Sequence, residues 1–389
     1  MELNTYYADL HIHIGRTFHG APVKITASNS LTITNIFHYV EKKKGIDIVG
    51  VIDAHVPQVL DEIQQLIDRG ICHELEEGGV SNGNVTLLLG SEIEIFDDNS
   101  SGPIHVLCFF PTIEVMREFA KWYKIYVKNP TLSSQRIYID AKSLQKQVKQ
   151  LNGLFIPAHV FTPFKSLYGK GVKESLSEVF IPELIDAIEL GLSSDTYMAE
   201  NIAELKDYTF LTNSDAHSLE KIGREYQAIK LGAPTFAELE KALLNKDGRH
   251  IEANYGMNPK LGKYYSTICR DCDTQLEQYT ERCPKCQSNK IIKGVSERIK
   301  ELSSADRQLM KRPPYIHQVP LEYIPGLGFK TLEKLRESLH HDMYIIHYAS
   351  KEQIKNVANE KIAEYVIQLR EGKLEIQPGG GGTYGKIVT

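Results

Sequence analysis

The sequence predicts an α/β barrel domain followed by a small four-cysteine zinc module and a helical C-terminal domain. Three observations support this order. Short β-type runs alternate with amphipathic stretches over the first 250 residues, four cysteines cluster between positions 269 and 286, and a helix-rich segment follows them. Strands separated by helices are typical of a mainly parallel sheet, and this many repeats favour a barrel.

The β-type runs are short and rich in branched apolar residues, as expected for buried strands. We predict strands at Tyr7–Ile14, Ile46–Ile52, Val85–Ile95, Ile104–Phe110, Leu154–Ala158, Ile185–Leu190, Phe210–Ser214 and Ala228–Leu231. The helix-like stretches between them are Leu31–Lys44, Pro57–Asp68, Ile113–Tyr126, Ala141–Leu151 and Phe236–Leu244. Antiparallel pairings stay open, because periodicity does not reveal the direction of a strand.

Changes in composition divide the chain into segments. The alternation ends near Asn254–Pro259. We therefore expect a barrel domain at 1–255, a zinc module at 256–296, a helical domain at 297–377 and a glycine-rich tail at 378–389. A length of 389 residues supports several domains, because it exceeds what one ordinary core accommodates.

Composition and charge are those of a soluble globular protein. Apolar residues make up 42% and charged residues 24% of the chain. There is no run of about 18 apolar residues to predict a membrane span, and the first residues lack signal-peptide features, so we expect a cytoplasmic location. Residues 1–255 carry a net charge of −10 and the remainder +5. The acidic part suits a site that collects cations, and the basic part is compatible with nucleic acid.

The run Asp9-Leu10-His11-Ile12-His13 is the first sign of a metal site. Side chains alternate along a strand, so we expect Asp9, His11 and His13 to project from one face. Two imidazoles at this spacing can hold one divalent ion, with Asp9 orienting a ligand ring.

Further residues of metal-ligand type stand where apolar runs end. They are Asp53, His55, Glu92, His159, Asp215 and His217, whereas His105 begins its run. The carboxyl ends of barrel strands converge on one face, so we expect these side chains to meet there. Imidazoles and carboxylates suit zinc, manganese or iron, and carboxylates can bridge two ions. The pattern predicts a polynuclear hydrolytic centre, with acyl or amide hydrolysis open beside phosphoester hydrolysis.

The clustered cysteines form two Cys-x-x-Cys pairs. Cys269, Cys272, Cys283 and Cys286 offer four thiolates, which is the ligand set of a closed, structural zinc site. Zinc should stabilise a module that is too small to fold on its own core. Both nucleic acid and protein remain open as contact partners of this module.

The run Ile324–Leu335 resembles a helix-hairpin-helix motif. In that motif a glycine-rich turn and the following helix start present backbone N–H groups to DNA phosphates, independently of sequence. Lys330 and Lys334 would add positive charge. A helix-turn-helix element used only for packing is the alternative interpretation.

The metal-ligand constellation resembles the PHP family (polymerase and histidinol phosphatase). The family's opening D-x-H-x-H, later H, G-x-E, further H positions and final D-x-H all occur here in order. The resemblance implies a distorted (β/α)7 PHP barrel that carries three metal ions. It assigns the ligands in three sets, namely His11, His13, Glu92 and Asp215; Glu92, His105 and His159; and His19, His55 and His217. The residue Ala54, inserted between Asp53 and His55, departs from the family pattern.

Together with the cysteine module and the helical segment, the barrel is similar to the endonuclease Q family of DNA-repair enzymes. The likeness rests on Tyr7–His13, Ala158–Phe164, Ala187–Asp195, Ser214–His217 and the cysteine module. It implies a metal-dependent endonuclease that nicks DNA 5′ of deaminated bases (uracil, hypoxanthine, xanthine) and of abasic sites, with Zn²⁺, Mn²⁺ or Mg²⁺ in the barrel. It also implies a nucleoid-associated location and leaves replication or repair proteins open as partners. The candidate catalytic residues are Glu92, His159, Asp215, Asp9 and Arg224.

Substrate contacts are expected from aromatic and basic residues near these motifs, because reading a damaged base requires its extrusion from the duplex. The candidates are Tyr6, Tyr7, Phe161, Phe164, Lys165, Tyr168, Lys170, Arg224, Lys330 and Lys334. Two other functions stay open. One is a PHP phosphatase that acts on a small metabolite, and the other is a non-catalytic DNA-binding scaffold.

Overall fold

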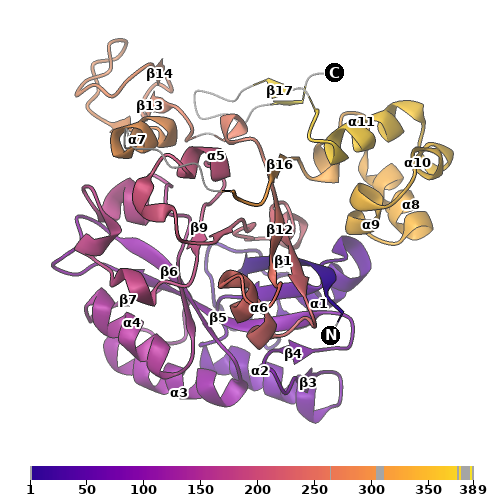
Figure 1. The fold of residues 1–389 in the computed structure, drawn as a ribbon, viewed down its shortest axis with the longest axis horizontal. Helices are drawn as coiled ribbons and strands as arrows, with labels where there is room; N and C mark the ends of the chain where they lie inside the picture. Colours follow the sequence, from indigo (N-terminus) through magenta and orange to yellow (C-terminus); the bar gives the residue numbers. More distant parts are fainter. Residues whose placement is uncertain (1, 263, 304–310, 375, 378–385, 388–389) are drawn as a thin grey trace.

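A curled β-sheet with helices packed around it forms the lower part of the molecule (Figure 1). The computed structural model describes residues 2–262, 264–303, 311–374, 376–377 and 386–387. The strands that build this part are β1 (Asn4–Ile12), β2 (Ile48–Val51), β3 (His73–Glu74), β4 (Val80–Ser81), β5 (Thr86–Ile95), β6 (Ile104–Phe110), β7 (Arg136–Ile137), β8 (Leu154–Pro157), β9 (Ile188–Glu189), β10 (Phe210–Leu211), β11 (Tyr226–Leu231) and β12 (His250–Gly256).

Seven of the described strands close into a ring in the order β1, β2, β5, β6, β8, β9 and β10. Direct pairing joins neighbours from β1 to β8 and joins β9 to β10. Backbone hydrogen bonds bridge the remaining gaps, from Asp186 N to Phe155 O at 3.0 Å and from Ala216 N to His11 O at 3.0 Å. The predicted distorted PHP barrel is therefore confirmed.

One strand of the ring runs against the others. β6 is antiparallel to both β5 and β8, whereas β1, β2 and β5 are mutually parallel. The start of β6 therefore lies at the same end of the barrel as the carboxyl ends of β5 and β8. This end is called the mouth below.

Amphipathic helices cover the outside of the ring, and local sequence sets their limits. The helices are α1 (Ile33–Tyr39), α2 (Pro57–Asp68), α3 (Ile113–Tyr123), α4 (Ala141–Gln150), α5 (Thr196–Ala199) and α6 (Phe236–Leu243). Thr112 and Thr235 cap α3 and α6 by accepting hydrogen bonds from backbone N–H groups of the first turn. α1 continues as a π-helical turn, Val40–Lys44, that ends at Gly45 with a φ of 72°.

The apolar core has two parts, because alternate residues of each strand face opposite sides. Leu10, Leu88 and Leu107 belong to a cluster that includes the barrel interior, whereas Leu87 and Leu89 belong to the larger cluster that packs under the helices. The interior cluster occupies the barrel below the mouth.

The cysteine module lies at the upper left of Figure 1 and the C-terminal helices at the upper right. The module contains β13 (Thr267–Cys269), β14 (Gln275–Leu276) and β15 (Ile291–Ile292), and α7 (Val295–Leu302) follows it. The C-terminal helices are α8 (Phe329–Leu339), α9 (Asp342–His347), α10 (Lys351–Val357) and α11 (Glu360–Arg370). Short strands β17 (Ile376–Gln377) and β18 (Lys386–Ile387) pair with each other. The rest of the predicted tail at 378–389 lies outside the described residues.

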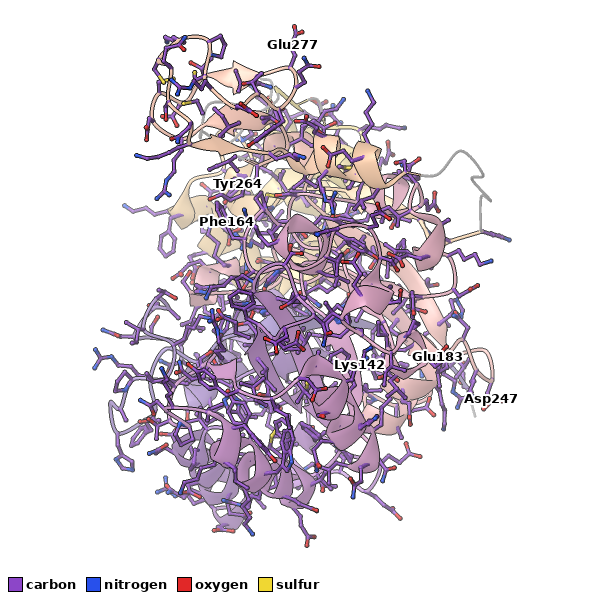
Figure 2. All side chains as sticks on the ribbon, turned by 90° about the vertical axis from the view of Figure 1, so that its left-hand side faces the viewer. Lys142, Phe164, Glu183, Asp247, Tyr264 and Glu277 are labelled. Atoms are coloured by element: carbon purple, nitrogen blue, oxygen red, sulfur yellow. The ribbon has the colours of Figure 1, made fainter. Side chains whose placement is uncertain are left out.

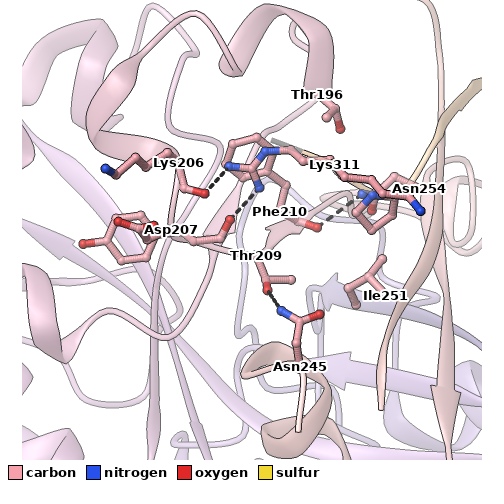
Figure 3. Close-up of a pocket in the computed structure, with 12 residues that line it drawn as sticks. Thr196, Lys206, Asp207, Thr209, Phe210, Asn245, Ile251, Asn254 and Lys311 are labelled. Carbon is pink, nitrogen blue, oxygen red and sulfur yellow. Dashed lines mark hydrogen bonds between the residues drawn. The ribbon is translucent and has the colours of Figure 1, made fainter. Parts of the chain in front are cut away.

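The helical segment is not independent of the barrel sheet. Its strand β16 (Tyr315–His317) pairs in parallel with β12. Just before β16, the guanidinium of Arg312 donates hydrogen bonds to the carbonyl oxygens of Leu205, Lys206 and Tyr208 at 2.7–2.9 Å and stacks on Phe210. These contacts line a pocket of about 280 Å³ at the start of β10 (Figure 3). The segment after the zinc module is thus anchored to the barrel.

Aromatic contacts fasten the C-terminal helices to β1 and β11. The Tyr7 ring stacks on the His347 imidazole at 4.6 Å, and the Tyr226 hydroxyl lies 2.7 Å from His347 Nε2. Burial lowers the pKa of His347 to about 3, so the ring is neutral near pH 7. In the part of the chain that the structure describes, no helix has the length and apolar character needed to cross a bilayer.

Candidate metal centre

Seven residues of metal-ligand type meet at the barrel mouth. They are His11, His13, Glu92, His105, His159, Asp215 and His217. Six of them come from the end of β1 and the residue that follows it, from β5 or from the segments after β8 and β10. His105 begins its strand, and it reaches the same mouth because β6 runs in the opposite direction.

The ligand atoms fall into three adjoining groups, each with its atoms within 4.8 Å of one another. The groups are His11, His13 and Glu92; Glu92, His105 and His159; and His13, Asp215 and His217. Glu92 belongs to the first two groups, and His13 belongs to the first and third. Shared ligands are the feature that distinguishes a polynuclear centre from separate sites.

Glu92 connects the two sides of the centre. Its Oε1 lies 2.8 Å from His105 Nδ1 and 3.5 Å from His159 Nε2. The same oxygen is 3.5 Å from His11 Nε2, and Oε2 is 3.6 Å from His13 Nε2. Asp215 closes the centre from the other side, with Oδ1 3.4 Å from His11 Nε2.

Unsatisfied ring nitrogens are the strongest evidence that these residues fit metal ions. The Nε2 atoms of His11, His13 and His105 are buried, and none has a hydrogen-bond partner among the described residues. A buried polar atom without a partner costs about 1–3 kcal/mol, so three in one place are unusual unless a cation binds them.

Electrostatics keep the carboxylates in the ligand form. Burial alone would raise the pKa of the Glu92 carboxyl, but His105 and Lys24 lower it well below its usual value. Burial likewise opposes ionisation of Asp215, and the adjacent His11 and His13 lower its pKa well below normal. Both groups are therefore ionised near neutral pH, which is the state that binds divalent cations.

Two carboxylates that do not belong to the three groups orient the ligand rings. Glu189 accepts a hydrogen bond from His11 Nδ1 at 3.0 Å and from the backbone N–H of His159 at 2.8 Å. Asp53 Oδ2 lies 3.2 Å from His13 Nδ1. Such contacts fix the ring and direct its other nitrogen at a metal. Sequence reasoning missed Glu189, although it stands at a strand end like the ligands, and it left the role of Asp53 open.

The backbone of two ligands is held in an unfavourable conformation. His159 has a φ of 32° and Asp215 a φ of 47°, in the left-handed region that side chains other than glycine seldom adopt. Gly191 makes room for His159, since a Cβ there would lie 2.7 Å from the His159 Cβ. Strain of this kind concentrates at functional sites.

The residues assigned to a third ion are not brought together. His19 is exposed and stands beside Phe18. His55 is buried, with Nδ1 2.9 Å from the Ser91 hydroxyl and its ring against Tyr123. His217 instead joins His13 and Asp215.

Two candidate catalytic residues contact the backbone rather than the ligands. Asp9 accepts hydrogen bonds from the N–H groups of Ser214 and Gly223 at 3.1 and 2.8 Å, and Arg224 Nε donates to the Ser214 carbonyl at 2.8 Å. We expected Asp9 to project from the same strand face as His11 and His13. The regular alternation is interrupted, because the register of β1 on β2 shifts between Asp9 and Ile12. Both residues hold the segment that carries Asp215.

A pocket of about 440 Å³ opens over these candidate ligands. Its rim includes Lys24, Ser134, Phe164 and Lys165. Lys24 Nζ lies 3.2 Å from Glu92 Oε2, and no sequence motif marked this lysine. Lys165 pairs with Glu94 at 2.9 Å, and Phe164 is 45% exposed.

Other predicted substrate contacts occupy different places. Phe161 is 1% exposed and stacks on the buried Tyr168, whose hydroxyl donates to Glu204, so both rings serve the core. Tyr6 and Tyr7 lie toward the start of β1, away from the mouth. Aromatic residues near a motif in sequence can thus be packed away from it.

The four cysteine sulfurs form a group of their own, all within 4.8 Å of one another. Cys269 Sγ lies 3.5 Å from Cys286 Sγ, and Cys272 Sγ lies 3.6 Å from Cys283 Sγ. A tetrahedral ion with Zn–S bonds of about 2.3 Å places its sulfurs about 3.8 Å apart. The thiolates therefore fit a structural zinc ion.

The hairpin-like turn at the start of α8 lies beside the barrel. Gly326 has a φ of 82°, and a Cβ on Gly326 or Gly328 would meet no atom within 4 Å, so the turn is open to a ligand. Lys330 and Lys334 are exposed on α8. Lys221, four residues after His217, donates to the Tyr323 hydroxyl at 2.8 Å and so links the turn to the mouth segment.

Comparisons with known proteins place this arrangement in context. A family model described as PHP-associated matches residues 195–247. An uncharacterized Bacillus subtilis (strain 168) protein, YqxK, is 51% identical over 381 residues, which are 98% of each chain. The crystal structure of the lesion-specific endonuclease PfuEndoQ from Pyrococcus furiosus is 30% identical, with a TM-score of 0.85 over 99% of this chain and 95% of that one. A structure of endonuclease Q with a 27-mer duplex that holds an abasic lesion at the active site is 31% identical, with a TM-score of 0.83 over 99% of this chain and 96% of that one.

Proposed function

The chain belongs to the endonuclease Q family, and on this premise we propose that it is a metal-dependent endonuclease that cuts DNA 5′ of abasic and deaminated nucleotides. The observation that carries the proposal is the shared carboxylate of Glu92 between two histidine groups, at the floor of an open pocket of about 440 Å³. The likeness to the two endonuclease Q structures over 99% of the chain supports the choice of DNA as substrate.

The residues present fit the metal chemistry that this reaction requires. His11, His13, Glu92, His105, His159, Asp215 and His217 would hold the ions. Bound divalent ions would lower the pKa of a water molecule and neutralise negative charge on the phosphoryl group under attack. Glu189 and Asp53 contact Nδ1 of the His11 and His13 rings and fix their orientation, which leaves the Nε2 atom of each ring free to hold an ion.

The rim of the pocket suits a phosphate flanked by nucleosides. Lys24 and Lys165 supply positive charge beside the carboxylate centre, and Phe164 offers an exposed ring at the edge. A volume of about 440 Å³ lies within the ~300–1,000 Å³ range of ligand pockets, enough for one nucleotide but not for stacked base pairs. A damaged or missing base is the easiest to move out of the duplex, which supports selectivity for lesions.

A PHP phosphatase that acts on a small metabolite is the second candidate. A phosphatase would use the same ligands, but it would not need the open glycine turn beside the mouth or the four-cysteine module. These two features favour a macromolecular substrate.

A cleavage assay tests the proposal. The full chain, loaded with Mn²⁺ or Mg²⁺, is incubated with end-labelled duplexes that carry one abasic site, uracil, hypoxanthine or xanthine, and with an undamaged duplex. We expect a nick on the 5′ side of the lesion and none in undamaged DNA. Hydrolysis of histidinol phosphate or similar monoesters, with every duplex left intact, would favour the phosphatase.

A paired variant separates the enzyme from a DNA-binding scaffold. H11A/H13A removes two buried ligands from the centre. An enzyme should lose cleavage and keep its affinity for lesion-containing DNA, measured by fluorescence anisotropy. A scaffold would lose neither DNA affinity nor any reaction, since the wild-type chain would show no cleavage to begin with.

A further inference from the structure

A second cleft lies between the barrel and the zinc module. Its volume is about 630 Å³, and its walls are the segment Pro163–Val172 of the barrel and β15 with its neighbours in the module. Figure 2 shows the junction, where Phe164 of the barrel lies just below Tyr264 of the module. The two rings meet edge to face with centroids 5.4 Å apart. We call this space the basic cleft.

The lining of the basic cleft is strongly cationic. The charged residues that line it are Lys170, Arg270, Lys290, Lys293 and Arg298, and no carboxylate is among the lining residues that the structure describes. Carboxylates do neutralise part of this charge from outside, because Lys290 pairs with Asp271 and Lys293 pairs with Glu301. Arg298 also contacts Glu301 at 3.2 Å.

Two cations in the basic cleft keep their charge available. Lys170 and Arg270 are both exposed, and within the described ranges neither side chain has a hydrogen bond or an ion pair. They stand on opposite walls, Lys170 on the barrel and Arg270 on the first cysteine knuckle. Cations on facing walls suit a polyanion that passes between them.

The walls are fixed with respect to each other. The Arg298 guanidinium donates to the carbonyl oxygens of Tyr168, Val172 and Lys173 at 2.6–3.0 Å, which ties α7 to the barrel segment. Arg270 follows the zinc ligand Cys269, and its backbone N–H donates to the Lys290 carbonyl at 2.8 Å. A zinc ion in the module would therefore hold Arg270 at the cleft without contacting the molecule that binds in the cleft.

The basic cleft adjoins the catalytic pocket. Phe164 lines both spaces, so a chain that leaves the metal centre past this ring enters the basic cleft directly. Neighbouring phosphates of a DNA strand are spaced a few ångströms apart, so one strand reaches both spaces at once.

We propose that the basic cleft binds the sugar–phosphate backbone of the substrate strand beside the cleaved nucleotide, with Arg270 of the zinc module and Lys170 of the barrel as its cationic contacts. This inference rests on the proposed function, since the pocket next to the cleft must take DNA. It gives the zinc module a direct part in holding substrate. Recognition of phosphates is independent of sequence, so these contacts add affinity and orientation rather than lesion selectivity.

The test compares the R270A/K170A double variant with the wild-type chain. Affinity for a duplex with one abasic site is measured by fluorescence anisotropy at several salt concentrations, in the presence of Ca²⁺ to prevent cutting. The expected result is a Kd raised by at least about tenfold, with the slope of log K against log salt reduced by about one to two.

The matched control is K285A. Lys285 is exposed on the second knuckle of the same module but does not line the basic cleft, so this variant should keep the wild-type Kd and salt slope. The zinc content of each variant verifies that the module stays folded. R270K, which keeps the positive charge, should retain most of the wild-type affinity for DNA. Wild-type Kd and salt slope in the double variant would overturn the proposal. Failure of the proposed function is a separate result, because the wild-type chain would then cut none of the lesion duplexes.

Discussion

Glu189 lies beneath the metal centre with its Oε1 3.0 Å from Nδ1 of His11, and its other oxygen accepts the backbone N–H of His159 at 2.8 Å. One buried carboxylate therefore sets the positions of ligands on both sides of Glu92. Asn213 donates to the same carboxylate at 2.7 Å. Because charged groups at this depth need several partners, the network constrains where each ring points.

Glu189→Gln should weaken both metal affinity and cleavage by about 10–100-fold, because loss of the negative charge releases His11 from its orientation. Metal titration followed by calorimetry, together with the cleavage rate at saturating DNA, measures the two effects. Glu183→Gln is the matched control, since Glu183 is exposed in the same segment of the chain. Wild-type metal affinity in Glu189→Gln would remove Glu189 from any positioning role.

Glu92→Gln should abolish cleavage more completely than Glu189→Gln, by more than about a hundredfold, because Glu92 is shared by two ligand groups. Affinity for abasic DNA should remain within a few fold of wild type, because the cationic rim is unchanged. Metal analysis by mass spectrometry should show fewer ions in the barrel. A variant that keeps its full metal complement and its rate would contradict the shared role of this carboxylate.

Cys283→Ser should remove about one zinc ion per chain, because a structural site with four thiolates is lost when one ligand is replaced. The barrel metals should stay bound, since the two sets of ligands do not overlap. Limited proteolysis should then cut within the module, at 264–294, sooner than in wild type. This experiment uses the full chain, because truncation after residue 255 would remove β16 from its pairing with β12.

K330A/K334A tests the hairpin-like turn as a DNA contact. Binding to damaged and undamaged duplexes should weaken to the same degree, and the salt slope should fall by about one to two, because phosphate contacts carry no sequence information. Lys361→Ala on α11 is the control for charge removed from the C-terminal helices. Unchanged binding would leave the turn with a packing role only.

Asp47 should give the stability of the protein a specific pH dependence. Its carboxylate accepts the backbone N–H of Tyr7 at 2.7 Å, and burial raises its pKa from 3.8 to about 6. The folded state therefore binds a proton more tightly than the unfolded state. The stabilisation is complete below pH 4 and is lost as the pH rises through 6, by up to roughly 3 kcal/mol.

Asp47→Asn removes this titration. The free energy of unfolding from urea titrations, measured at several values between pH 4 and pH 7 with a chelator present, should fall less steeply with pH in the variant than in the wild type. Parallel profiles for the two proteins would show that Asp47 titrates alike in the folded and unfolded states.

The sequence by itself determined many of the barrel elements and the kinds of ligand, whereas β12 was not predicted. Strand-like runs and the helix at Pro57–Asp68 are local features, so their limits could be predicted to within a few residues. The four thiolates and the histidines at strand ends could also be predicted, because ligand chemistry is a property of the residue and strand ends converge in any barrel.

Tertiary structure decided which side chains share an ion and which are packed away. The reversed direction of β6 brings His105 to the mouth, and Asp9 accepts hydrogen bonds from the backbone N–H groups of Ser214 and Gly223 beside a register shift in β1. Phe161, a predicted substrate contact, is buried in the core. Lys24 lies beside Glu92 of the centre, although no sequence motif marked it. Strand direction, register and burial depend on contacts between residues far apart in the chain, and those contacts leave no periodic mark in the sequence.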